Sequence, residues 1–213
     1  MWKNILIALV ISVFSGHIMA IEEPEYEVLE TSGTSEIRAY KAMIVAETLV
    51  DGSMDEASSK GFRRIAGYIF GANTSTVGEN TKIDMTAPVT IKPKAEKISM
   101  TAPVTMKGEE GSWRVHFVMP GEYTMETLPR PNETNVILRE VPAQKYAVIR
   151  FSGLAGEKKI AVKTEELMEW LAEKNISQQG QPQLARYNPP WTLPFFRRNE
   201  VMIAIGLAGE LKP

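Results

Sequence analysis

The chain has 213 residues, 44% of them hydrophobic and 23% charged, which is typical of a soluble globular protein with one domain or two small fused repeats. A formal net charge of −2 gives no electrostatic reason to expect a nucleic acid or an anionic membrane as a partner. Because the chain contains no cysteine, disulfides, thiol nucleophiles, iron–sulfur clusters and cysteine-ligated zinc are excluded.

The first twenty residues have the pattern of a secretory signal peptide. Lys3 precedes an apolar run, ILIALVISVF, and the segment ends in SGHIMA before a polar region. We expect a signal peptide over residues 1–20 with cleavage after Ala20, which predicts a periplasmic or secreted protein. The alternative is an uncleaved N-terminal anchor, although the apolar run is shorter than the ~20 residues of a full span.

Histidine is scarce, which restricts the possible chemistry. The chain has two histidines, and signal removal would leave His116 alone. A hydrolytic triad or a multi-histidine metal site is therefore hard to assemble, and we expect no enzymatic activity.

The first half reads as strands, a helix and more strands. Residues 26–50 contain two extended runs, YEVLET and EIRAYKAMIVAETLV, separated by a turn at Gly33, which predicts antiparallel strands. A helix is predicted over about residues 54–70, because Ser53 is a suitable N-cap before an acidic first turn and apolar residues recur at helical spacing.

A nine-residue phrase follows twice, as KIDMTAPVT at residues 82–90 and KISMTAPVT at residues 97–105. Apolar residues alternate in both copies, which predicts two strands with equivalent apolar faces. Because proline cannot donate a ladder hydrogen bond, we expect each strand to lie at a sheet edge or to be bulged at its proline. Met85 and Met100 could offer thioether ligands, but the alternation favours core packing.

The segment WRVHFVMP, residues 113–120, predicts another strand with two distinct faces. One face carries Trp113, Val115, Phe117 and Met119, and the other carries Arg114, His116 and Val118.

The predicted order of strands and helix then repeats in the second half of the chain. VILREVPAQKYAVIRFSG predicts a second strand pair, and GEKKIAVKTEELMEWLAEKNI predicts an amphipathic helix with Val162, Leu167, Trp170 and Leu171 inward. Strands near residues 183–187 and 200–205 complete it. The order predicts an α+β fold of two repeats, about residues 25–120 and 134–206. Their strands would form one curved or closed antiparallel sheet with both helices outside or against it.

Several phrases in order resemble the SOUL haem-binding protein family: MTAPV after a helix ending in GAN, then FVMP, ETLPRP and ARYNPPWTLPFFRRNEV. The resemblance covers residues 25–206. It implies two pseudo-symmetric βαββ repeats that form a distorted antiparallel β-barrel flanked by two long helices. It also implies binding of haem or a related tetrapyrrole without catalysis.

The family's proposed pocket runs along the first helix and near the tyrosine of RYNPP, which points here to Phe62, Arg63 and Tyr187 as cofactor-binding residues. Phe62 would lie against the macrocycle, Arg63 would pair with a propionate, and Tyr187 would stack or donate a hydrogen bond. The alternative is that Phe62 belongs to the core face of the helix and Arg63 to its solvated side. If the Trp113 face forms the barrel interior, His116 points to solvent or lies under a helix, and a surface histidine is the favoured interpretation over an iron ligand.

We therefore expect an exported, non-catalytic tetrapyrrole-binding protein that acts as a carrier, buffer or sensor. The alternative is a small-molecule effector-binding domain of the same fold for a different apolar or cationic ligand. We expect a tetrapyrrole as partner, no nucleic acid, and no stable membrane insertion after signal cleavage.

Overall fold

The structure is a computed structural model that describes residues 22–75, 103–109, 112–188 and 191–206. The predicted signal peptide and the first copy of the doubled phrase, residues 82–90, lie outside these residues. Of the second copy, only Pro103, Val104 and Thr105 are described, and they lead into strand β5. The equivalence of the two copies thus stays a prediction.

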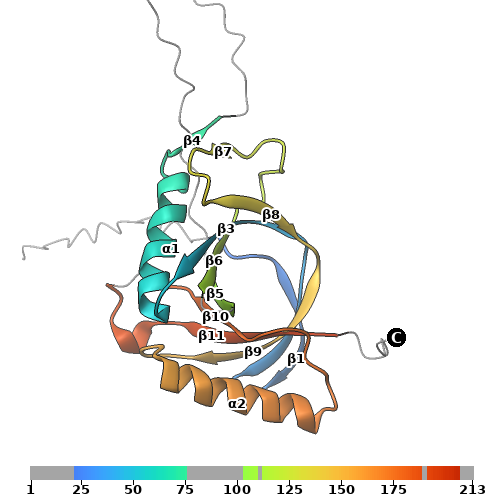
Figure 1. The fold of residues 1–213 in the computed structure, drawn as a ribbon. Coiled ribbons are helices and arrows are strands. Elements are labelled where there is room, and N and C mark those ends of the chain that lie inside the picture. Colours follow the sequence, from blue (N-terminus) through green and yellow to red (C-terminus); the bar gives the residue numbers. More distant parts are fainter. Residues whose placement is uncertain (1–21, 76–102, 110–111, 189–190, 207–213) are drawn as a thin grey trace, which may run out of the picture.

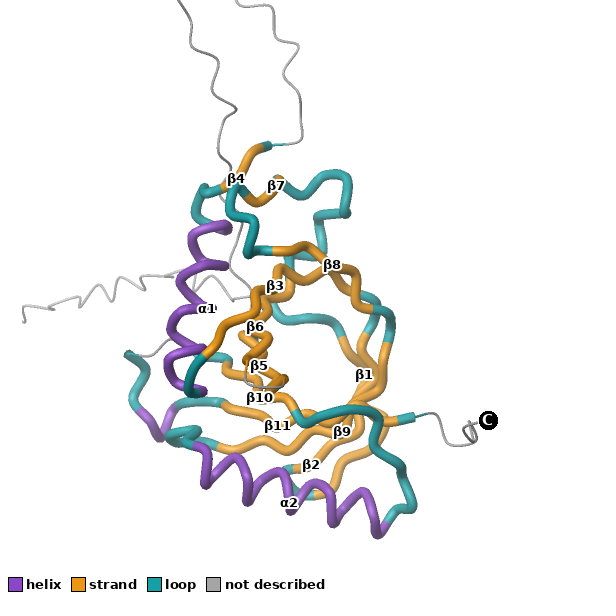
Figure 2. The backbone as a smooth tube through the Cα atoms, viewed as in Figure 1, coloured by secondary structure: helices purple, strands orange, loops and turns teal. Residues whose placement is uncertain are grey.

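Nine strands form one antiparallel sheet that curls into a half-barrel (Figures 1 and 2). Their order across the sheet is β1-β2-β9-β11-β10-β5-β6-β3-β8. The bounds are β1 (Tyr26–Ser32), β2 (Ser35–Tyr40), β3 (Met43–Asp51), β5 (Val104–Glu109), β6 (Ser112–Val118), β8 (Ile137–Val141), β9 (Gln144–Phe151), β10 (Gln183–Arg186) and β11 (Asn199–Ile205). Within the described residues β1 and β8 do not pair with each other, so the sheet is curved but open.

A short pair stands apart from this sheet, formed by β4 (Asn73–Thr74) and β7 (Arg130–Pro131). The helices are α1 (Met54–Ile69), α2 (Glu157–Glu173) and the short 3-10 helix η1 (Pro194–Phe196). The α+β class and the two flanking helices agree with the prediction from the sequence.

The start of α1 follows the sequence closely. Ser53 caps the helix: its hydroxyl accepts a hydrogen bond from the backbone N–H of Glu56, and the Glu56 carboxylate accepts one from the Ser53 backbone N–H. This capping box satisfies two backbone donors that would otherwise lack partners at the helix start. Phe70 is the C-cap, in agreement with the helix predicted over about residues 54–70.

Two local predictions were wrong. Residues 36–50 were expected to form one extended run, but β2 ends at Tyr40 and β3 begins at Met43. The chain breaks there because β2 pairs with β9 whereas β3 pairs with β6 and β8. In α2, Leu167 and Leu171 are buried as predicted, but Val162 is 47% exposed because it lies outside the face that packs on the sheet.

Both helices lie outside the curl of the sheet, as Figure 1 shows. The main core therefore sits between the helices and the outer face of the sheet. On β6 this face carries Val115 and Phe117, which are fully buried. Phe62 of α1 packs there, with its ring centroid 5.5 Å from that of Phe117. The opposite face of each strand, including His116, lines the inside of the half-barrel.

Candidate functional site

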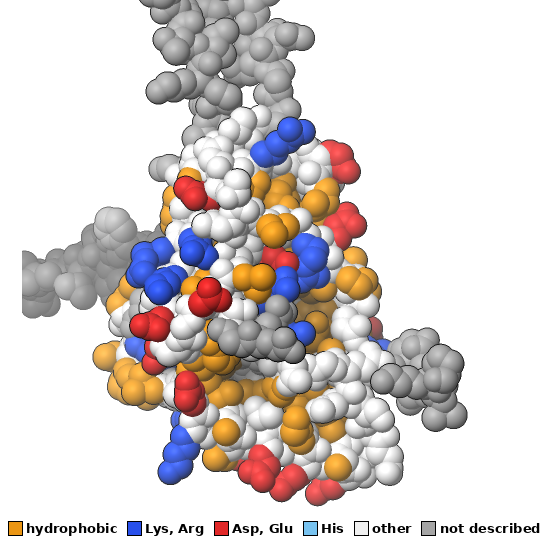
Figure 3. Space-filling model, viewed as in Figure 1, with side chains coloured by type: hydrophobic (Ala, Val, Ile, Leu, Met, Phe, Trp, Pro, Cys, Tyr) orange, Lys and Arg blue, Asp and Glu red, His pale blue; other side chains and the backbone are white. Residues whose placement is uncertain are grey.

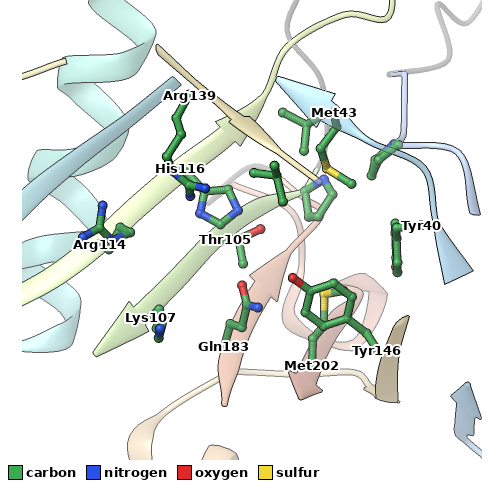
Figure 4. A pocket seen from close by; sticks show the side chains of 14 residues that line it. Tyr40, Met43, Thr105, Lys107, Arg114, His116, Arg139, Tyr146, Gln183 and Met202 are labelled. Carbon is green, nitrogen blue, oxygen red and sulfur yellow. The ribbon is translucent and has the colours of Figure 1, made fainter. Parts of the chain in front are cut away.

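The inside of the half-barrel holds a cavity of about 490 Å³, here called the lumen cavity (Figure 4). Its wall combines side chains from eight strands with one residue before β1 and one before β5. The lining residues are Pro24, Tyr40, Met43, Pro103, Thr105, Lys107, Arg114, His116, Val118, Arg139, Val141, Tyr146, Gln183 and Met202. The volume lies within the roughly 300–1,000 Å³ usual for small-molecule sites.

Strand register explains why these residues meet. Directly paired residues of neighbouring strands point to the same face of a sheet. His116 pairs with Glu47 on one side and Thr105 on the other. Because Arg139 pairs with Val45, two residues before Glu47, its side chain also points inward. The lumen cavity is thus built from residues far apart in the sequence.

A buried carboxylate holds two arginines beside the cavity. Glu47 is 4% exposed and accepts hydrogen bonds from Arg114 Nη1 at 2.6 Å, from Arg139 Nη2 at 2.9 Å and from Arg139 Nε at 3.0 Å. The two guanidinium groups are therefore fixed in position, and together with Lys107 they give the cavity wall a positive excess.

His116 lies at this charged part of the wall, next to Arg139 in Figure 4. Its ring is half-buried, and its Nδ1 is buried with no hydrogen-bond partner within the described part of the chain. Burial lowers the pKa of His116 to about 4; Arg139 and Arg114 add to the shift and Glu47 opposes it. The imidazole is therefore neutral near pH 7, the form in which histidine ligates a metal.

The remaining wall is largely apolar and aromatic. Tyr40 and Tyr146 meet edge to face with ring centroids 5.6 Å apart, a favourable arrangement for aromatic rings. Met43, Met202 and Val118 add flexible or branched apolar surface. A flat, apolar ligand with anionic groups would match this combination of surfaces.

A buried ionic cluster adjoins this wall at Tyr40. Arg38 donates hydrogen bonds to the Tyr40 hydroxyl at 3.1 Å and to Glu200 at 2.9 and 3.2 Å. Glu200 also accepts hydrogen bonds from the Tyr187 hydroxyl at 2.6 Å and from Arg198 Nε at 2.9 Å. Burial raises the pKa of Tyr40 to about 12, although Arg38 opposes the shift. Tyr40 thus remains a neutral hydroxyl at the cavity wall.

A second cavity, of about 730 Å³, lies between the chain before β1 and the loop after β6. Glu22, Lys41, Tyr123 and Glu140 are among its lining residues. It shares Pro24, Met43, Val118 and Val141 with the lumen cavity, so the two spaces adjoin.

The three residues predicted to bind the cofactor do not form one group. Phe62 is half-buried against Phe117 on the outer face of the sheet, and Arg63 beside it is exposed. Tyr187 is buried on the inner face, with the Arg198 guanidinium 3.7 Å from its ring centroid. None of the three lines the lumen cavity.

The favoured interpretation of His116 as a surface histidine was wrong. The helices cover the Trp113 face of β6, so the opposite face with His116 turns into the lumen. The strand's alternation was visible in the sequence, and only the identity of the covered face was missing.

Comparison with known families decides what kind of protein this is. The family model described as "SOUL heme-binding protein" matches residues 21–204. The chain belongs to the SOUL family. A comparison with curated proteins gave no match.

Solved structures show that the fold of this SOUL protein is shared more widely. The C-terminal domain of EcmrR has a TM-score of 0.56 and 12% identity, covering 85% of this chain and 98% of that one. A hydrolase from Listeria innocua also has a TM-score of 0.56, with 13% identity, covering 84% and 94% of the two chains. At these identities the likeness concerns the fold alone.

The lumen cavity of this SOUL protein fits the chemistry that haem requires. Iron takes His, Met or Tyr as axial ligands, and His116, Met43 and Tyr40 all line the cavity. Propionates need cations, which Arg114, Arg139 and Lys107 supply. The unpartnered, buried Nδ1 of His116 is the observation that favours this residue. Within the described residues no group of three or more His, Asp or Glu side chains could hold a metal ion. Among those residues, too, no helix is long and apolar enough to span a membrane.

Proposed function

We propose that this protein binds haem or a related tetrapyrrole reversibly in the lumen cavity, with His116 as the axial ligand. The observation that supports this most is the position of the His116 imidazole in the wall of a cavity of about 490 Å³, beside two arginines that Glu47 fixes in place. Membership of the SOUL family supports the class of ligand. When bound, haem would supply an iron centre, and the protein would supply its orientation and surroundings.

Arg139 is the residue we assign to a propionate. Its side chain is 44% exposed, so a carboxylate could reach it without displacing Glu47. Arg114 and Lys107 line the same cavity and would raise the affinity for a second carboxylate. Tyr40, Tyr146 and Met202 would contact the macrocycle.

We propose a non-catalytic role as an exported carrier, buffer or sensor. The apolar run at residues 5–14 supports export, and a single histidine in the lumen offers no acid–base pair for turnover. The alternative is a domain that binds a different apolar or cationic ligand. Carboxylates lining the second cavity, including Glu22 and Glu140, favour a cation there.

The test is a haem titration of the purified protein, followed by Soret absorbance. We expect saturable binding, with a loss of about tenfold or more in affinity and a changed Soret maximum in His116→Ala. Arg63→Ala is the matched comparison, because Arg63 belongs to the first-helix location predicted from the sequence. Loss of binding in Arg63→Ala with an unchanged His116→Ala would move the ligand to α1. Turnover of a tetrapyrrole by the purified protein would contradict the non-catalytic role.

We further propose that the sheet is built from two related units, β2-β3-α1-β5-β6 and β8-β9-α2-β10-β11. The strand order supports this. The counterparts are β2 and β8, β3 and β9, β5 and β10, and β6 and β11. Exchanging each strand for its counterpart turns the order β2-β9-β11-β10-β5-β6-β3-β8 into the same order reversed. Each unit contains one of the two βαββ repeats expected at residues 25–120 and 134–206.

A further inference from the structure

The loop between β10 and β11 exposes an unusual amount of large apolar surface. Four of its side chains are more than half exposed: Trp191 at 79%, Phe196 at 69%, Phe195 at 65% and Leu193 at 56%. Leu154, at 62%, lies nearby, because the neighbouring Gly153 donates a backbone hydrogen bond to Pro194 at 2.9 Å. Contiguous exposed apolar surface of this kind marks a site of interaction with another protein or with a membrane.

The loop is held in this arrangement by the rest of the fold. Arg197 Nε donates to the Thr192 carbonyl at 2.7 Å, and the η1 turn is closed by the Arg197 N–H to the Pro194 carbonyl at 3.1 Å. Asn199 Nδ2 anchors the adjoining β9–α2 loop through the Gly153 carbonyl at 3.0 Å. The apolar side chains therefore point outward because the backbone is fixed, and no rearrangement is needed to present them.

The loop is a protruding corner and forms no groove. Figure 1 places η1 at the edge of the molecule beside the starts of α1 and α2, and Figure 3 shows hydrophobic side chains gathered there. None of the loop's described residues lines the lumen cavity or the second cavity. A protein partner would need a matching hollow for these rings, whereas a bilayer interface accepts protruding Trp, Phe and Leu directly.

The charges beside the loop match an anionic surface. Arg197 lies in the loop itself, Arg186 donates to the Ala155 carbonyl at 3.1 Å, and Lys159 donates to the Ser152 carbonyl at 2.7 Å. Arg186 also forms an ion pair with the largely exposed Asp55, at 3.8 Å. Basic residues beside an apolar anchor attract anionic lipid headgroups.

We propose that the loop of Trp191, Leu193, Phe195 and Phe196 is a peripheral membrane anchor that inserts into the interface of a bilayer containing anionic phospholipid. The anchor binds reversibly and does not cross the bilayer. It is independent of the lumen cavity, so loss of one function leaves the other measurable.

The test uses the predicted mature chain, residues 21–213, so that neither Trp2 nor the apolar run at residues 5–14 reaches the bilayer. Vesicles contain brominated phosphatidylcholine and phosphatidylglycerol, because bromine quenches only tryptophans that enter the bilayer. We expect quenching, its loss in Trp191→Phe, and its loss in the double variant Phe195→Ser with Phe196→Ser. Vesicles without phosphatidylglycerol should quench about tenfold less at equal lipid.

Phe70→Ser is the matched control. Phe70 is 56% exposed at the far end of α1, so it has the same chemistry without belonging to the loop. Its quenching should equal that of the parent. Equal quenching in the parent and Trp191→Phe would overturn the proposal, because the signal would then come from elsewhere. Absence of quenching in the parent would also overturn the proposal. Dissociation of a lipid-free dimer in the double serine variant would then assign the loop to a second copy of the chain.

Discussion

Arg38 and Glu200 form an ion pair that crosses strand β9, which lies between β2 and β11 in the sheet. Arg38 Nη1 lies 2.9 Å from Glu200 Oε2, and the two side chains are 3% and 0% exposed. Tyr187 and Arg198 add hydrogen bonds to the same carboxylate. The cluster therefore fixes the inner face of the half-barrel next to Tyr40.

Glu200→Gln should strongly destabilise the fold, because it leaves Arg38 and Arg198 without their buried counter-charge. Breaking a buried pair in this way costs about 3–5 kcal/mol. The free energy of unfolding in urea measures the loss. Glu166→Gln is the matched control, since its pair with Lys163 on α2 is partly exposed and worth about 0–1 kcal/mol. Equal effects in the two variants would contradict the structural role of Glu200.

Tyr187→Phe separates a structural role of Tyr187 from a ligand-binding one. The hydroxyl donates to Glu200 at 2.6 Å, and a hydrogen bond to a charged group contributes about 1.5–3 kcal/mol. We expect that loss in the free energy of unfolding, with the haem titration of the folded variant unchanged. A stable variant that no longer binds haem would restore the binding role predicted from the sequence.

Stability should fall between pH 6.5 and pH 4 because of His116. In the folded protein its pKa is about 4, against 6.5 in the unfolded chain, so over this range protons bind the unfolded state preferentially. The difference corresponds to a loss of about 3 kcal/mol that is complete below pH 4 and absent above pH 6.5. Urea unfolding of the parent and His116→Gln at pH 7 and pH 4.5 measures it. The variant should lack most of this part of the pH dependence, and an identical slope in both proteins would contradict the burial of the ring.

Glu200 should cause a separate loss of stability at acidic pH. Burial alone would raise its pKa, but Arg38, Tyr187 and Arg198 outweigh burial and hold the pKa below its ordinary value. A carboxylate with a lowered folded pKa contributes stability above its unfolded pKa and loses it as the pH falls through the folded value. Below about pH 4.5 the parent should lose stability that Glu200→Gln has already lost. The two urea curves should therefore converge on acidification.

Gly61→Ala tests the contact between α1 and the sheet. A Cβ at Gly61 would lie 2.6 Å from Cγ2 of the buried Val115, and such overpacking costs about 1–3 kcal/mol. Gly67→Ala on the same helix is the control: no atom lies within 4 Å of the added Cβ, so helix propensity should stabilise the protein by about 0.8–1.0 kcal/mol. Thermal unfolding midpoints should shift in opposite directions, and a shared direction would contradict the packing described for α1.

Several features were readable from the sequence because they depend on neighbouring residues. Ser53 and Glu56 mark the start of α1 by local hydrogen bonds, and the alternation from Trp113 to Met119 defines a strand with two faces. The ordered phrases from MTAPV to ARYNPPWTLPFFRRNEV resembled the SOUL family, and the family model confirms it. The cap and the alternation each lie within a few neighbouring residues, and the phrases are read directly from the order of residues, so none of these signals needs tertiary information.

The position of the cavity was decided only by tertiary structure. One face of β6 carries the apolar Trp113, Val115 and Phe117, and the other carries Arg114, His116 and Val118. The alternation could not say whether the helices or the lumen lie on the apolar face. Glu47 meets Arg139 across 92 residues of sequence. Phe62 and Tyr187, which the family's proposed pocket had grouped, lie on opposite faces of the sheet. Sheet register and helix packing are long-range properties. They turn His116 into the lumen, and no local pattern in the sequence encodes that choice.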